Sequence, residues 1–312
     1  GDESSIGVTL AKQITGLYPI SRLFMSYYNF PMYYGMGFYI VLSIVVFYLF
    51  VKIASLKYGL LNTLANTKSS YANDKVSYER KSVFFSLYQK ELGRFLSSYM
   101  AVLNAGLGVI LLCVFSICFL FNSVGQIGNS AGIENINEYL SNLAPVFIAS
   151  MLSLSCPAAS SISLEGKNIW ILKSSPVEVK TILNAKIAVN LTLHLIGYMI
   201  SVSVFMLKLD MSPIQVMNLV IVPICYSLFI MVIGISLNKK YPNYDWDSEM
   251  IVVKQSLPVI VTGIISMITL ITPILLNWFF NLPIIFVLQA VSVILLAISF
   301  RVYIKMTKLN FI

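Results

Sequence analysis

Seven stretches of about 20 mostly apolar residues constrain this chain more than any other feature of its sequence. A helix needs about 20 such residues to cross a bilayer, because its backbone amides must be satisfied within the segment. The chain is 58% hydrophobic and 11% charged, whereas a soluble domain has about 25% charged residues. The sequence therefore predicts an all-α fold, a polytopic transmembrane bundle of about seven spans. The predicted spans are Gly35–Ala54, Ser97–Phe121, Ala144–Ser163, Thr181–Leu207, Gln215–Leu237, Leu257–Leu276 and Pro283–Tyr303.

The distribution of Lys and Arg predicts the orientation of these spans. Of the 21 basic residues, all except Lys12, Arg22 and Lys208 fall in four segments near the ends of the first, third, fifth and seventh spans: Lys52–Arg94, Lys167–Lys186, Lys239–Lys254 and Arg301–Lys308. Cytoplasmic segments carry an excess of Lys and Arg, so we expect these four segments, and with them the C-terminus, to be cytoplasmic. Residues 1–32 then form an extracellular N-terminal segment. The chain is predicted to be a multi-pass protein of the cytoplasmic (inner) membrane, with the lipid bilayer as its solvent.

Residues 55–98 are predicted to form a cytosolic linker that ends in an amphipathic helix from residue 82 onward. The residues that share its apolar face are Phe84, Tyr88, Leu92 and Phe95. Their spacing of four, four and three residues is typical of one helical stripe. Such a helix is expected to lie at the membrane interface with its stripe in the lipid, turning at Ser97 and Ser98 into the second span. An ordinary N-terminal extension of that span is the alternative.

Two predicted cytosolic loops contain charged, aromatic and proline residues that a simple connection does not need. The first contains Glu165, Gly166, Lys167, Asn168, Trp170 and Pro176, and the second contains Tyr241, Pro242, Tyr244, Trp246 and Lys254. Pro176 can open a short helix at its first turn, with Glu178 near the positive end of the helix dipole. Aromatic residues at a membrane boundary are often headgroup anchors, and this is the alternative interpretation of Tyr244 and Trp246.

The sequence carries no catalytic signature that we recognise. It lacks the G-x-x-x-x-G-K-[ST], H-E-x-x-H and G-x-S-x-G motifs, and its four cysteines lie in apolar segments without metal-site or disulfide spacing. The basic residues form no patch with interleaved aromatics, so nucleic acid is not an expected partner. We expect no catalytic, cofactor-binding or metal-binding residue, and no enzymatic activity in this chain.

Ionisable side chains inside the spans, which would mark an ion pathway, are nearly absent. No Asp or Glu lies in the interior of a predicted span, although a proton-driven or sodium-driven transporter generally needs one there. His194 is the one titratable side chain near the middle of a span. A hydrogen-bonded interhelical role is favoured for His194, and equally for Asn104 and Asn190, over a proton relay.

Three segments together resemble the permease subunits of ATP-binding-cassette exporters, in particular the fused bacterial kind that carries two transmembrane halves. They are Leu87–Phe95 (LYQKELGRF), Ser163–Pro176 (SLEGKNIWILKSSP) and Tyr241–Ser256 (YPNYDWDSEMIVVKQS). The resemblance implies that residues 97–312 form a six-span half and that residues 33–54 are the last span of a preceding half. The missing N-terminal half of the same polypeptide would then be a partner. It also implies that residues 82–98 are a connecting helix and residues 165–180 the loop that docks on the ATPase.

From this resemblance we expect a permease component of an ATP-driven exporter that moves an unidentified substrate together with a separate cytosolic ATP-binding-cassette ATPase. No cofactor is expected on this chain. An ATP-independent secondary transporter or channel is one alternative, which the lack of carboxylates inside the spans disfavours. A membrane-embedded lipid-modifying enzyme is another; it needs polar catalytic groups clustered at one depth, and His194 has no such companion in the sequence.

Overall fold

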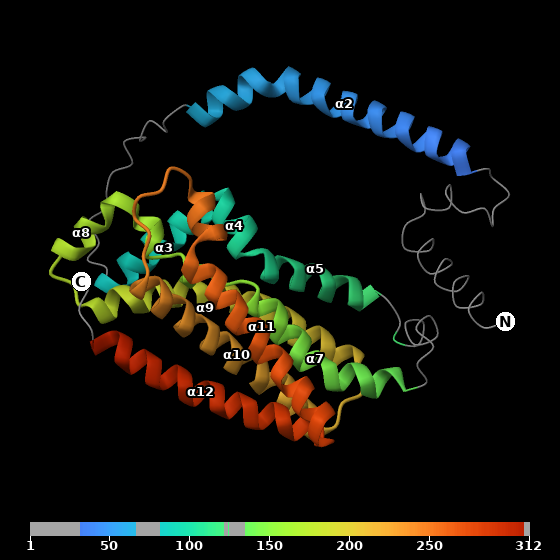
Figure 1. Cartoon of the computed structure of the whole chain (residues 1–312), viewed down its shortest axis with the longest axis vertical. Helices are drawn as coiled ribbons and strands as arrows, with labels where there is room; N and C mark the ends of the chain where they lie inside the picture. Colours follow the sequence, from blue (N-terminus) through green and yellow to red (C-terminus); the bar gives the residue numbers. More distant parts are fainter. Residues whose placement is uncertain (1–31, 67–81, 122–123, 125–134, 309–312) are drawn as a thin grey trace. The chain divides into compact units, whose positions relative to one another are not determined.

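The computed structural model describes residues 32–66, 82–121, 124 and 135–308 (Figure 1). The chain divides into two units, residues 1–79 and residues 80–312. The described part of the first unit is one helix, α2 (Met32–Asn66), and the apolar stretch Ile40–Ile53 lies inside the first predicted span. The predicted extracellular segment falls almost entirely outside the described residues, as does the middle of the predicted linker.

The described part of the second unit consists of helices joined by turns and short loops and contains no strand. Its α-helices are α3 (Val83–Ser97), α4 (Tyr99–Ala105), α5 (Leu107–Phe121), α7 (Ile136–Ser153), α8 (Ile169–Ser174), α9 (Val179–Lys208), α10 (Pro213–Lys240), α11 (Leu257–Phe280) and α12 (Ile284–Lys308). Two short 3₁₀ helices, η3 (Pro157–Ala159) and η4 (Ser163–Asn168), follow α7, and a π-helical turn, η5 (Ile251–Gln255), precedes α11.

Helix α10 is the central helix of the second unit. It packs against α7, α9, α11 and α12, which run beside it in Figure 1. Its start is specified locally: Pro213 occupies the first turn, and Ser212 and Gln215 form a capping box in which each side chain accepts from the other residue's backbone N–H. By contrast, α11 has the smallest buried share among the five span-length helical runs of the second unit.

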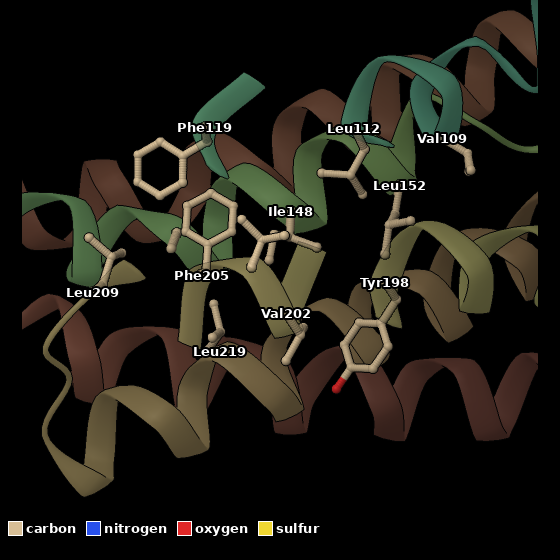
Figure 2. Close-up of a cluster of buried hydrophobic side chains, with 12 residues drawn as sticks. Val109, Leu112, Phe119, Ile148, Leu152, Tyr198, Val202, Phe205, Leu209 and Leu219 are labelled. Carbon is tan, nitrogen blue, oxygen red and sulfur yellow. The ribbon is translucent and has the colours of Figure 1, made fainter. Parts of the chain in front are cut away.

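A buried apolar cluster joins α5, α7, α9 and α10 (Figure 2). The rings of Phe119 and Phe205 stack with their centroids 5.1 Å apart, and Ile148 and Leu219 fill the space beside them. In a bilayer the lipid is as apolar as the cluster, so close van der Waals packing holds the helices together. Gly108 allows this packing, because a Cβ there would lie 2.0 Å from Met151 O on α7.

The predicted all-helical architecture is confirmed, and each predicted span overlaps at least one helix. Five helical runs in the described residues are long and apolar enough to cross a membrane, or six if α4 and α5 count as one span bent by 62°. The predicted turn at Ser98 is also confirmed: α3 ends at Ser97, and the Ser98 hydroxyl caps α4 by accepting from Ala101 N.

The prediction for the third span is wrong in its C-terminal part. A continuous helix over Ala144–Ser163 was expected, but α7 ends at Ser153 and the chain continues as turns and 3₁₀ helices. Pro157 gives the physical reason, because proline lacks the N–H that a helix interior needs and disfavours a helical conformation in the residue before it. An apolar composition alone did not reveal this break.

Candidate functional site

The non-helical segment after α7 is buried in the protein, so its backbone polar groups need protein partners. Asn190 of α9 accepts a hydrogen bond from Ala158 N at 3.1 Å. Asn238 of α10 accepts from Ile162 N at 2.7 Å and from Ser163 N at 3.1 Å. The Asn238 amide also donates to Ser163 Oγ at 2.7 Å. Two asparagines on neighbouring helices therefore replace the hydrogen bonds that a continuous helix would have supplied.

His194 belongs to the same polar network. Its Nε2 donates to Ser155 O, because a carbonyl oxygen can only accept, and a neutral ring then accepts at Nδ1 from Ser227 Oγ at 2.7 Å. The prediction that His194 and Asn190 make interhelical contacts is confirmed. The same prediction is wrong for Asn104, whose amide donates to Met100 O in its own helix at 2.9 Å.

Replacing His194 with Ala is expected to lower the free energy of unfolding by about 2 kcal/mol, because Ser155 O loses its buried donor. Gln can reach one of the two partners and should lose less. Unfolding in mixed detergent micelles, followed by circular dichroism at pH 6 and pH 8, measures both variants. If His194 is a proton-titrating group instead, the wild-type stability will change steeply between these pH values and the Gln variant will abolish that change.

A buried cluster of charges joins three elements of the second unit at Lys186. The Lys186 ammonium, on α9, lies 2.8 Å from Glu91 Oε1 of α3 and 2.8 Å from Glu165 Oε1 of η4. It also donates to Ser161 O at 3.0 Å. All three charged side chains are buried, with Lys186 only 2% exposed. A buried charge is stable only when it is paired and hydrogen-bonded, so these contacts fix η4 against α3 and α9.

Two further cations of α3 complete this charge cluster. Arg94 pairs with Glu91 one turn away and with Glu165 at 2.9 Å, and it donates to Ser161 O at 2.9 Å. Lys90, which is half exposed, lies 3.1 Å from Glu165 Oε2. The role of Glu91 was not predicted from the sequence, where the i,i+3 spacing of Glu91 and Arg94 is the one local signal for it.

The two predicted cytosolic loops contact each other. Gly166 has φ +55°, and a Cβ there would lie 3.3 Å from the Trp246 ring. The Trp246 indole N–H donates to Ser163 O at 2.8 Å. Lys173 lies over the Tyr244 ring, 5.8 Å from its centroid, and burial, with a smaller effect of the Glu165 carboxylate, raises the pKa of the Tyr244 phenol. The second loop therefore covers the turn that begins the first.

Other members of the second loop reach α4 or remain exposed. Glu249 accepts a hydrogen bond from Ser98 Oγ, which ties the loop to the start of α4. Tyr241 and Lys254 are exposed, and Pro242 is half-buried. Among the residues predicted for the second loop, Trp246 is the one whose side chain donates a hydrogen bond within the protein.

The residues predicted for the first loop divide into an inward group and an outward group. Glu165 and Gly166 are buried, whereas Lys167, Asn168, Trp170 and Pro176 are exposed. Within α8, Ile169 and Leu172 are buried in a cluster with residues of α9, α10 and α12. The adjacent Trp170 and Ile171 are 63% and 51% exposed, so α8 presents a large apolar pair outward from a fixed base.

The apolar stripe of α3 lies mostly against the protein. Phe95 is buried and Tyr88 and Leu92 are half-buried, in a cluster with residues of α4 and α9. Tyr88 Oη also lies 2.9 Å from Thr192 Oγ1. The expectation that this stripe lies in lipid is wrong for these three residues, since α9 supplies an apolar surface that competes with lipid. Phe84, at the start of α3, is 40% exposed.

Among the described residues, no group of three or more His, Cys, Asp or Glu side chains is placed to hold a metal ion. Cys113, Cys118, Cys156 and Cys225 are free thiols. The candidate site is therefore the exposed apolar pair Trp170 and Ile171, on a loop that buried polar and ionic contacts hold in place.

Comparison with known proteins identifies one family. A family model described as "Putative ATP-binding cassette" matches residues 109–307, which run from the first turn of α5 to the last turn of α12. No curated protein and no solved structure matches the chain.

Proposed function

Because the chain belongs to the ATP-binding cassette family whose model it matches over residues 109–307, we propose that it is the permease component of an ATP-driven exporter. In this proposal a separate cytosolic ATPase hydrolyses ATP, and no catalytic role is assigned to the present chain. The transport direction, outward across the cytoplasmic membrane of a bacterium, follows from the resemblance of its loops to those of exporter permeases.

The exposed pair Trp170 and Ile171 is the observation that carries the proposal. An exposed Trp beside an exposed Ile, flanked by the basic residues Lys167 and Lys173, has the composition of a binding surface, in which buried aromatic residues dominate the affinity. We assign this face of η4 and α8 as the docking surface for the ATPase. Basic residues at its rim favour an acidic rim on the partner and mainly affect the rate of association.

The ion pairs behind this surface can couple docking of the ATPase to movement of the spans. Glu165, at the base of the loop, is held by Lys186 of α9 and by Arg94 of α3. A displacement of η4 therefore moves α3 and α9 with it, because breaking these ion pairs leaves buried charges unpaired. ATP binding to the ATPase can shift the equilibrium between two arrangements of the helix bundle only if the docking contact differs between those arrangements.

The division of the chain agrees with a fused arrangement of two halves. The second unit, residues 80–312, holds α3 and all the helices of the proposed six-span half. Helix α2, in the first unit, is then the last span of a preceding half. That half of the same polypeptide is the second partner in the proposal.

Replacing Trp170 with Ala is expected to weaken binding of the ATPase by about 2 kcal/mol or more, roughly thirtyfold, because the anchor of the docking surface is lost. Lys167→Ala should cost less, since an exposed charge contributes little affinity. Co-purification of the ATPase with the full-length permease, followed by titration of its binding, measures both variants.

Trp278→Ala is the matched control for this experiment. Trp278 is 72% exposed, but it lies near the C-terminal end of α11, in a different part of the chain from the loop. It should leave ATPase binding unchanged. If Trp170→Ala also leaves binding unchanged while substitutions at exposed Tyr241 or Lys254 abolish it, the second loop is the docking surface.

A further inference from the structure

A cavity of about 340 Å³ is lined mainly by residues of α4, α7, η3 and α11 and shares no residue with the docking surface. None of the residues that line it is charged. Its volume falls at the lower end of the range for small-molecule sites, which are mostly apolar with a few polar groups that fix the ligand.

Two hydroxyl groups in this cavity have no partner among the described residues. Ser153 and Ser266 are 6% and 4% exposed, both line the cavity, and neither side chain makes a hydrogen bond within the part of the chain that the structure describes. The other two hydroxyls of the lining, those of Ser150 and Thr262, donate to carbonyl groups of their own helices. Both serines line the cavity, so a ligand in it that carries a complementary group can form a hydrogen bond with each hydroxyl.

The amide of Asn104 adds a third polar group to the same wall. Its Nδ2 donates to Met100 O, and its Oδ1 has no donor among the described residues. The cavity therefore offers two hydroxyls, each able to donate or accept, and one acceptor, with no ionic partner. A charged ligand would lose its hydration without compensation there, so an uncharged ligand is favoured.

The open side of the cavity is apolar. Leu154 and Met267 are 63% and 64% exposed, and Gly263 of α11 is exposed, with nothing within 4 Å of where its Cβ would lie. All three line the cavity, on or next to helices that are long and apolar enough to cross a membrane. A molecule dissolved in the bilayer could thus enter between α7 and α11 without crossing water.

We propose that this cavity binds an uncharged lipophilic molecule carrying a hydroxyl or carbonyl group, which enters from the bilayer. Resting on the proposed function, this is the class of substrate that the exporter takes up. The hydroxyls of Ser153 and Ser266 hydrogen-bond its polar group, and its apolar chain lies toward Leu154 and Met267.

Photolabelling of the full chain in lipid nanodiscs, without ATPase, tests this proposal. The probe is a photoactivatable long-chain primary alcohol, compared with the carboxylate and the hydrocarbon of the same chain length, and the labelled residues are mapped by mass spectrometry. The alcohol should label α4, α7 or α11 residues of the cavity more strongly than either analogue. The double substitution Ser153→Ala and Ser266→Ala should weaken labelling by the alcohol about tenfold, because two hydrogen bonds of ordinary strength are lost.

Gly263→Trp and Ile268→Trp form a matched pair of variants. The first places a large ring in the cavity, and the second places the same ring on exposed Ile268 of α11, which does not line the cavity. Gly263→Trp should abolish labelling at the cavity and Ile268→Trp should leave it unchanged. Equal labelling by all three probes, labelling that Gly263→Trp does not reduce, or no labelling at the cavity because another helix fills it would each overturn the proposal. Failure of ATPase docking would leave these results unaffected, so the two proposals fail independently.

Discussion

Replacing Glu165 with Gln is expected to lower the free energy of unfolding by about 3 kcal/mol or more, which is the cost of removing one member of a buried ion cluster. Among the described residues, Glu165 and Glu91 are the two carboxylates that pair with the ammonium of Lys186 and the guanidinium of Arg94. Gln keeps the shape and some hydrogen bonds but not the charge. Glu91 is then left as the single carboxylate for the buried Lys186, with Arg94 competing for it.

Unfolding of the protein in mixed detergent micelles, followed by circular dichroism, measures this change. Glu178→Gln is the matched control, because Glu178 is exposed at the start of α9 and makes no side-chain cap there. It should change the stability by less than about 0.5 kcal/mol. Adding Lys186→Met to Glu165→Gln should recover part of the loss, since it removes one of the two cations that then compete for Glu91. Equal stabilities of Glu165→Gln and Glu178→Gln would show that the cluster does not hold η4 in place.

Replacing Asn238 with Ala is expected to cost about 3 kcal/mol, because it leaves the N–H groups of Ile162 and Ser163 buried without an acceptor. Asn238 is fully buried, so water cannot replace its amide without disturbing the packing. The non-helical segment should then lose its fixed geometry. Because Trp246 donates to Ser163 O, its indole should become more exposed to solvent.

The fluorescence maximum of Trp246, in a variant whose other two tryptophans are replaced by Phe, reports on that change and should shift to longer wavelength. Micelle unfolding gives the stability in parallel. Asn104→Ala is the comparison, because Asn104 donates to its own helix and should cost about 1 kcal/mol or less. An Asn238→Ala protein with wild-type stability and fluorescence would mean that the segment is held by packing alone.

Much of the helical framework could be predicted from the sequence. The length of each apolar run requires a helix, because a bilayer leaves no other partner for the backbone. The turn at Ser98 was also predictable, since a serine between two helical segments caps the second one. For α8, the sequence placed Trp170 in a structured loop, and the structure adds that this residue points outward while Ile169 and Leu172 point inward.

The stripe of α3 shows a limit of hydropathy in a membrane protein. The spacing of Tyr88, Leu92 and Phe95 correctly placed them on one face, but it could not tell whether that face meets lipid or another helix. Both environments are apolar, so the same residues suit either. The end of α7 was missed for a related reason. An apolar segment rich in small residues has the hydropathy of a membrane span whether it is helical or not.

Except at the C-terminal end of α7, the sequence by itself determined which segments are helical and roughly where they begin and end, since these follow from local composition and capping. Only the tertiary structure decided which polar groups meet. Lys186 pairs with Glu91 across 95 positions of sequence, and Asn238 reaches Ile162 across 76. Neither pairing has a local signature, because each partner alone looks like an ordinary polar residue near a membrane boundary. Their burial, which makes the contacts strong, exists only once α3, α9 and α10 have packed around the break after α7.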